Sequence, residues 1–163
     1  MKVTVGGGQG SPRGAGMAKR RTIPTAILRQ VAVIERACYP RRVLAATERA
    51  TTTMCKSSAR FVVAHHNGKA VGYAIVEVEG SYGYVANLAV LPSRRRTPSV
   101  WKQLLSFLRE IIVNCHVVEA YCRETSRGLA IRELERLGYK VSSALNDYLF
   151  PGEVVTSIRA TKL

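Results

Sequence analysis

The chain has 163 residues, an apolar fraction of 47% and a net charge of +14. This length suits one domain with a substantial core, and the apolar content argues against wholesale disorder. No apolar run reaches the roughly 18–20 residues that a membrane span needs, and the N-terminus has no apolar signal core of about 7–15 residues. We therefore expect a cytoplasmic protein with no membrane partner.

The positive charge is concentrated in the first part of the chain. Residues 1–60 hold 12 Lys or Arg and 2 Glu, whereas residues 61–163 hold 13 Lys or Arg and 9 acidic residues. Such an excess favours a polyanionic or acidic partner, either nucleic acid or the ribosome or an acidic protein. A solubilising surface without a specific partner is the alternative.

The four cysteines indicate neither disulfides nor a metal site. Cys38, Cys55, Cys115 and Cys122 show no paired framework and no C-x-x-C spacing. A metal site built from Cys115, His116 and Cys122 is a weaker interpretation than burial of these thiols as small apolar groups. The prediction is therefore no metal.

The first half of the chain predicts a tail, two helices and a hairpin. The glycine-rich start indicates a flexible tail over residues 1–19, followed by a single domain over residues 20–163. Thr25 is placed to cap a helix, and a weaker helix is expected over residues 41–54. Strands are expected at residues 60–65 and 69–79, joined by the hairpin signal Asn67-Gly68.

The middle of the chain combines a strand, a basic turn and a helix. The apolar run from Tyr84 to Leu91 predicts a strand buried on both faces, ended by Pro92. Three arginines follow, and then Thr97 as N-cap and Pro98 at the first helical position. Free amides, the helix dipole and arginines together predict an anion site, with a solvated basic loop as the alternative.

The last part predicts a strand, a helix and a hairpin. A strand is expected at residues 116–122, and a helix capped by Thr125 or Ser126 should end at Gly138. Two further strands, over residues 139–150 and 153–161, are expected on either side of Pro151-Gly152, a pair suited to a type II turn.

Three stretches resemble a known family. Asn87-Leu-Ala-Val-Leu-Pro92, followed by Arg95 and a helix with Leu104-Leu105, is similar to the core of the GCN5-related N-acetyltransferase (GNAT) superfamily. Gly72-Tyr73-Ala74 matches a common strand element of that family. Ile34-Glu-Arg-Ala-Cys-Tyr-Pro40 is similar to the first helix of its ribosomal-protein-type members. The resemblance implies an α/β fold in which helices flank a mixed, mostly antiparallel sheet in three layers, α/β/α.

The resemblance also implies acetyl-CoA as cosubstrate. The backbone of Leu88, Ala89 and Val90 would hold its pantetheine arm. The pyrophosphate would lie on a loop and helix start formed by Arg95, Arg96, Thr97, Pro98, Ser99, Val100 and Trp101. The family loop carries glycines where this chain has Pro98 and Val100, so the loop is degenerate.

The family's catalytic side chains are not matched. The alignment puts Leu134 at the position of the tyrosine that protonates the leaving thiolate, and Cys122 at that of a glutamate base. Glu77 is the replacement that we expect for the base, and Tyr84 for the proton donor. Glu79, Tyr121 and Tyr148 are further candidates, and ordinary sheet residues are the alternative for all of them.

Two functions remain open from the sequence. The first is a divergent acetyl-CoA-dependent N-acetyltransferase, whose acceptor is an amine of a protein or of an aminoacyl-tRNA or other ribosome-associated molecule. The second is an inactive binding protein that docks on nucleic acid or an acidic protein through its basic surface. The resemblance leaves a homodimer formed through edge strands open.

Overall fold

The computed structural model describes residues 4–6, 22–38, 43–150 and 153–163. Within these ranges no helix has both the length and the apolar character to span a bilayer. The elements, in chain order, are β1 (Thr4–Gly6), α1 (Thr25–Cys38), α2 (Val43–Met54), β2 (Ala59–His66), β3 (Lys69–Glu79), β4 (Tyr82–Val90), the 3-10 helix η1 (Pro92–Arg94), α3 (Pro98–Ile112), β5 (Val117–Arg123), α4 (Glu124–Arg136), β6 (Tyr139–Phe150) and β7 (Glu153–Lys162).

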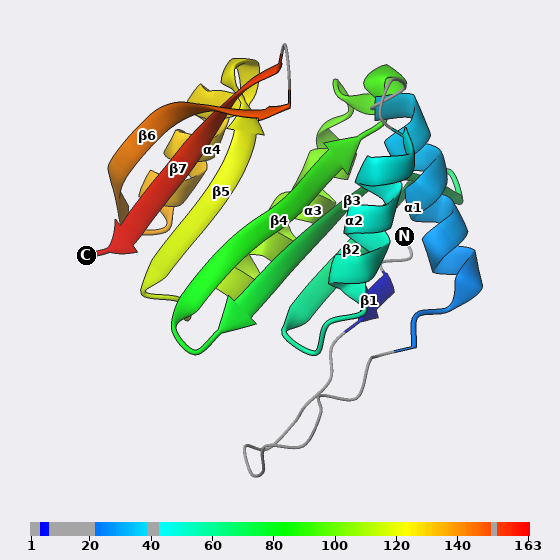
Figure 1. Cartoon of the computed structure of the whole chain (residues 1–163), viewed down its shortest axis with the longest axis horizontal. Helices are drawn as coiled ribbons and strands as arrows, with labels where there is room; N and C mark the ends of the chain where they lie inside the picture. The colour runs from blue at the N-terminus through cyan, green and yellow to red at the C-terminus, as the bar shows by residue number, and fades with distance from the viewer. Residues whose placement is uncertain (1–3, 7–21, 39–42, 151–152) are drawn as a thin grey trace, which may run out of the picture.

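The strands form one mixed sheet between two layers of helices. The strand order is β1-β2-β3-β4-β5-β7-β6. Only β4 and β5 pair in parallel among the described strands, and every other neighbouring pair is antiparallel. In Figure 1, α1 and α2 lie in front of β2 and β3, while α3 and α4 lie behind the sheet. The predicted α/β fold with helices on both faces is confirmed.

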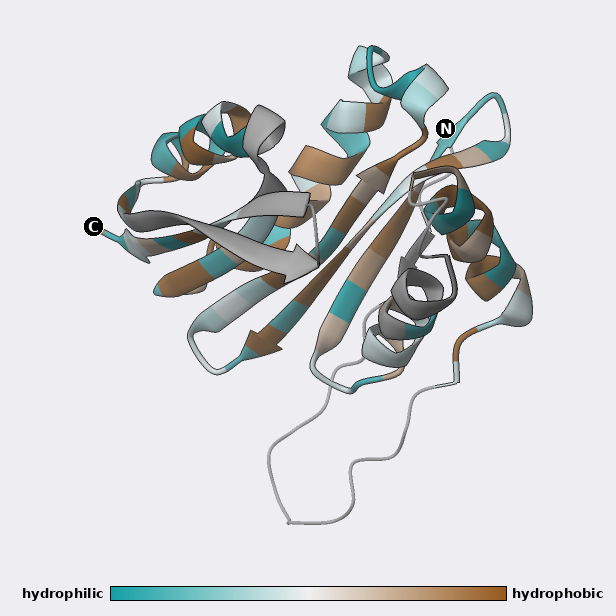
Figure 2. Ribbon diagram, turned by 45° about the horizontal axis from the view of Figure 1, so that its top comes forward, coloured by the Kyte–Doolittle hydropathy of each residue, from teal (hydrophilic) through white to brown (hydrophobic). Residues whose placement is uncertain are grey.

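Two apolar clusters hold the layers together. One joins α3 and α4 to the sheet and includes Val62, Ala74 and Leu104. The other joins α1 and α2 to the opposite face and includes Ile34, Phe61 and Tyr73. Alternate strand residues therefore serve opposite clusters, as a sheet that is covered on both faces requires. Figure 2 shows stretches of the strands in brown, and helices that carry both brown and teal residues.

The turn residues adopt the conformations that the sequence predicts. Asn67 and Gly68 have φ values of 51° and 74°, the left-handed pair of a two-residue hairpin turn. Gly138 follows α4 with a φ of 81°, which is the left-handed helix end that glycine favours. These positions fix the β2–β3 hairpin and the exit from α4.

The N-terminal segment contains one element that the sequence does not predict. Thr4–Gly6 pairs with β2 at the sheet edge, so this part of the expected flexible tail is a strand. The rest of residues 1–19, and the boundary at residue 20, lie outside the described residues and stay predictions. The turn at residues 151–152 also lies outside them, although the strands on either side of it agree with expectation.

The expectation that β4 is buried on both faces is wrong for most of the strand. Gly83, Ala89 and Val90 are buried, but residues 84–88 are partly exposed. For residues 86–88 the cause is that β4 loses its neighbour β5 after Val85. An apolar sequence reports hydrophobicity, whereas this exposure depends on where the next strand lies.

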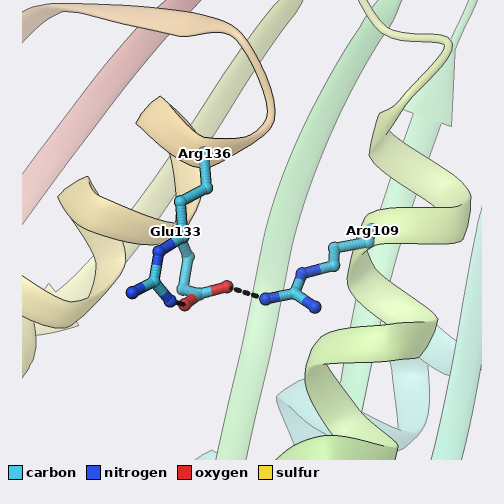
Figure 3. A network of polar contacts seen from close by, with 3 residues as sticks. All are labelled: Arg109, Glu133 and Arg136. Carbon is cyan, nitrogen blue, oxygen red and sulfur yellow. Dashed lines mark hydrogen bonds and ion pairs between the residues drawn. The ribbon is translucent and has the colours of Figure 1, made fainter.

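An ion-pair network connects α3 with α4 behind the sheet. The Arg109 guanidinium lies 2.5 Å from one carboxylate oxygen of Glu133, and that of Arg136 lies 2.8 Å from the other. Figure 3 shows the carboxylate between the two arginines. Burial opposes ionisation of Glu133, but the hydrogen bond and charge of Arg109, together with Arg136, hold its pKa below the ordinary value. The network therefore links the helix behind β2 and β3 to the helix behind β5, β6 and β7.

Candidate functional site

The central feature of the site is a fork between β4 and β5. The two strands pair from Tyr82 opposite Val117 to Val85 opposite Ala120, and no further. Beyond this seam of four residue pairs, β4 continues to Val90 beside β3, while β5 continues to Arg123 beside β7. Figure 1 shows the two halves of the sheet diverging here. The register of β4 against β3 also shifts at Ala86, where the fork opens.

The hydrogen-bond pattern of β4 determines which backbone groups face the fork. The Leu91 amide donates to the Val71 carbonyl of β3 at 2.8 Å. Ladder bonds of antiparallel strands alternate, so Ala89 also bonds toward β3, while Leu88 and Val90 turn their backbone groups toward the fork. The Val90 carbonyl accepts bonds from Cys38 Sγ and Arg95 Nε, each at 3.3 Å.

The predicted backbone residues therefore divide into two kinds. Leu88 and Val90 present polar backbone groups on the open side of β4. Ala89 faces β3 with its backbone, and its buried side chain packs with the α1–α2 cluster. Among the described residues, the Leu88 amide and carbonyl and the Val90 amide have no strand partner on that side.

The arginine loop lies between the fork and the start of α3. Arg94, Arg95 and Arg96 are all exposed, and α3 has no acidic residue in its first turn. Thr97 occupies the N-cap, as predicted, but its side chain makes no capping hydrogen bond. Three cations beside the positive end of a helix dipole repel one another and the dipole. An anion at this position would relieve that repulsion.

The loop uses much of its own hydrogen-bonding capacity. The amides of Arg94, Arg95, Thr97 and Val100 bond to carbonyls within the loop. Within the described structure, the loop amides left without a backbone acceptor are those of Ser93, Arg96 and Ser99. A glycine-rich loop leaves more amides available for phosphate, so this loop depends more on its arginine side chains.

The other predicted loop residues have different environments. Pro98 is exposed at the helix start, whereas the Val100 side chain is buried in the α3–α4 cluster. Trp101 is half-buried, and its indole N–H donates to the Arg95 carbonyl at 2.6 Å. Trp101 thus holds the arginine loop in place, and the buried side chain of Val100 is part of the core.

Glu77 and Tyr84 are neighbours below the fork. They lie opposite each other in the β3–β4 register, so their side chains share the sheet face that carries α1 and α2. The half-buried Glu77 carboxylate accepts a hydrogen bond from Lys56 at 2.8 Å. The Tyr84 ring packs edge to face against Tyr121, with centroids 6.1 Å apart.

Further polar residues, which the sequence analysis did not single out, continue this row across β5 and β7. Glu119 lies opposite Tyr84, and Arg159 lies opposite Glu119. The Tyr82 hydroxyl donates to Glu119 at 2.7 Å, and Arg159 lies 3.1 Å from the other Glu119 oxygen. Burial, followed by the Glu119 carboxylate, raises the pKa of Tyr82 to about 12. We call the surface formed by Tyr82, Tyr84, Glu119, Tyr121 and Arg159 the open face.

The sequence carried a signal for the open face. Along Val117-Val-Glu-Ala-Tyr121, polar or aromatic residues alternate with small apolar ones, which is typical of a strand with one exposed face. Tyr121 was a candidate on chemical grounds, whereas Glu119 and Arg159 lie 40 residues apart in sequence and meet through the β5–β7 pairing.

Glu35 of α1 is another polar residue near the site that the sequence did not single out. It is fully buried, and one of its carboxylate oxygens accepts bonds from the Tyr73 hydroxyl and from Asn87 of β4, the latter at 3.4 Å. The other oxygen has no hydrogen-bond partner among the described residues. Burial raises the pKa of Glu35. The sequence signal for this buried carboxyl group is a glutamate that lies between Ile34 and Cys38 on the apolar face of the helix.

The position of Leu134 agrees with the loss of a catalytic tyrosine there. Its side chain is buried within the α3–α4 cluster, where it serves packing. For the described residues, no three His, Cys, Asp or Glu side chains come together in a way that could hold a metal ion.

Comparison with known proteins identifies the family. The model of the acetyltransferase (GNAT) family matches residues 28–139, more than half of the chain. The chain therefore belongs to the GNAT acetyltransferase family. No curated protein matches it.

The names of proteins with solved structures of the same fold indicate diverse acceptors. The ribosomal-protein-S18-alanine N-acetyltransferase from Escherichia coli has a TM-score of 0.64 at 17% identity, covering 99% of this chain and 96% of its own. The aminoglycoside 6'-N-acetyltransferase from Enterococcus faecium has a TM-score of 0.60 at 13% identity, covering 85% and 92%. The PaiA N-acetyltransferase from Thermoplasma acidophilum, in complex with coenzyme A, has a TM-score of 0.62 at 12% identity, covering 99% of both chains. At these identities the likeness shows the fold.

Proposed function

We propose that the protein is an acetyl-CoA-dependent N-acetyltransferase whose acceptor is an amine of a protein or of an aminoacyl-tRNA or other ribosome-associated molecule. The observation that carries this proposal is the fork, because it leaves polar backbone groups of Leu88 and Val90 facing an opening between two strands. A cytoplasmic location remains a prediction from the sequence.

The residues present fit acetyl-CoA in two places. Leu88 and Val90 offer backbone donors and an acceptor to an extended arm carrying amides. Arg95 and Arg96 offer charge at the start of α3, where the amides of Arg96 and Ser99 add donors. Acetyl-CoA would supply the acetyl group already activated as a thioester.

The remaining requirements fall to this chain's own side chains. An amine attacks only when it is neutral, so its proton must have an acceptor, and the departing sulfur needs a proton. We assign the first role to Glu77, directly or through water, and the second to Tyr84. Their shared face and register below the fork support this assignment. Glu77→Gln and Tyr84→Phe should each lower kcat by roughly tenfold to a hundredfold, with the fold intact.

A CoA-dependent thermal shift tests the proposal. A ligand present at about 100 times its Kd stabilises the folded state by roughly 2.7 kcal/mol, which corresponds to roughly 5–11 °C in Tm for a chain of this size. The double variant Arg95→Ala, Arg96→Ala should lose most of this shift. The matched control is Lys69→Ala, Arg132→Ala, which removes two exposed cations elsewhere and should keep it. Unchanged CoA affinity in the first variant would show that the phosphates lie elsewhere.

A binding protein without catalysis is the second candidate. The internal hydrogen bonds of the arginine loop and the buried Leu134 at the family's tyrosine position favour it. On this reading CoA produces no shift in Tm, and the protein binds nucleic acid with steep salt dependence. The two candidates therefore give opposite results in the same two assays.

A further inference from the structure

Within the ion pair of the open face, the cation is presented to solvent and the carboxylate lies beneath it. The Arg159 side chain is 55% exposed, whereas that of its partner Glu119 is 26% exposed. The same asymmetry holds at the edge of the face, where Lys56 is 49% exposed and Glu77 15%. A molecule that approaches the face therefore meets the cation of each ion pair first.

This arrangement is unfavourable for polycationic acceptors. Polyamines and aminoglycosides carry several positive charges, and each charge needs a carboxylate that is free to receive it. On the described part of this face, Glu77 and Glu119 are already engaged by a cation, which leaves the exposed Glu79, opposite Tyr82, as the one carboxylate for an incoming amine. The net charge of +14 adds long-range repulsion to any polycation.

The chemistry of the amine adds a second criterion. An α-amino group has an ordinary pKa of about 7.7–8.0, whereas that of a lysine side chain is about 10.4. Roughly a tenth of α-amines are therefore neutral at pH 7, against fewer than about one in a thousand lysine amines. An α-amine therefore demands less of the base than a lysine amine does.

We infer that the acceptor site on the open face takes the free α-amine of a protein whose amino-terminal residues are acidic. The inference rests on the proposed acetyltransferase function and specifies its substrate class. The α-amine reaches the region of Glu77 and Tyr84 below the fork. The acidic residues that follow it contact the exposed guanidinium of Arg159 and the ammonium of Lys56.

The test compares labelled peptides that differ in charge alone. Each carries a free amino-terminal alanine, a fluorophore at its carboxyl end, and four aspartates, four serines or four lysines between them. Fluorescence anisotropy gives the affinity of each peptide, with and without CoA. Release of the CoA thiol from acetyl-CoA gives the rate for each peptide and for spermidine and kanamycin.

The aspartate peptide should bind at least about tenfold more tightly than the serine peptide at low salt, and this difference should shrink as salt is raised. It should also have the highest kcat/KM. Arg159→Glu should weaken its binding by about tenfold, and Arg159→Gln by a smaller factor. Arg132→Glu makes the same charge change on an exposed residue of α4, on the other side of the sheet, and should leave binding unchanged.

The outcomes separate this inference from the proposed function. Acetyl transfer that favours spermidine, kanamycin or the lysine peptide would overturn the acidic acceptor and keep the acetyltransferase. Transfer to an aminoacyl-tRNA without binding of the aspartate peptide would also overturn it. Absence of any CoA-dependent shift would overturn the acetyltransferase. Binding of the aspartate peptide that depends on Arg159 would still support an acidic partner on the open face.

Discussion

Gly72 lies where β3 approaches the fork strand most closely, and replacing it by alanine tests the geometry of the site. A Cβ at this position would lie 2.9 Å from the Ala89 carbonyl oxygen and 3.3 Å from both Leu104 Cδ1 and Val90 Cγ2. The carbonyl belongs to the backbone of β4, so it cannot rotate away as a side-chain end could. The added methyl therefore forces the two strands apart beside Val90, its partner in the register.

The expected loss of stability for Gly72→Ala is about 1–3 kcal/mol, the usual range for overpacking a well-filled core. For a domain of this size the loss corresponds to roughly 2–12 °C in Tm. Urea unfolding followed by circular dichroism gives the free energy of unfolding. Because Val90 faces the fork, CoA affinity should fall as well, and it is measured by calorimetry below the unfolding transition.

Gly128→Ala is the matched control with the opposite sign. This glycine is exposed within α4, and the nearest atom to an added Cβ is Arg132 Nη1, at 3.6 Å. The substitution should stabilise the protein by about 0.5–1 kcal/mol, because glycine is a poor helix former. If Gly72→Ala were as stable as the wild type, the close approach of β3 to Ala89 would be wrong.

Two further predictions concern buried carboxyl groups. Burial raises the pKa of Glu35 in the folded state, so wild-type stability should fall as pH rises above the ordinary carboxyl range. Glu35→Gln should lose that dependence, so in urea unfolding it should gain in stability on the wild type as pH rises above 4.5, the ordinary pKa of a glutamate; parallel curves would contradict it. The pKa of Glu133 is lowered, so its contribution is present at neutral pH and disappears as pH falls through the lowered value. Glu133→Gln should lower the free energy of unfolding by about 1 kcal/mol at pH 7 and bring it close to that of the wild type in acid. Glu135→Gln, which changes an exposed neighbour, should alter stability little. An equal loss at pH 7 and in acid would refute the ion-pair explanation.

Local signals in the sequence predict most of the fold. The Asn67-Gly68 pair, the Thr97-Pro98 helix start and the glycine after α4 each determine backbone conformation within a few residues, and the structure confirms all three. The strands on either side of residues 151–152 also agree. Such features depend on steric preferences of single residues and short patterns, which a sequence displays directly.

Features that depend on distant partners are harder to predict. The partial exposure of residues 86–88 in β4 follows from the departure of β5, whose pairing ends at Val85 and Ala120. The partner of Glu77 is Lys56, which reaches it from the irregular segment after α2. A hydrophobic pattern cannot show that Ala89 turns its backbone groups toward β3 and Leu88 toward the fork, because this assignment depends on the register with β3.

The seam between β4 and β5 has a mechanical consequence. Four residue pairs, the Arg109–Glu133 link and the apolar cluster that α3 and α4 share with the sheet hold the two half-sheets at a fixed angle. Such a joint can bend at the β4–β5 seam while the α3–α4 contacts support it from behind. Weakening those contacts should therefore change the width of the fork before it unfolds either half of the sheet. Selection on helix residues far from any substrate can thus tune how easily a long, thin molecule slides in and out.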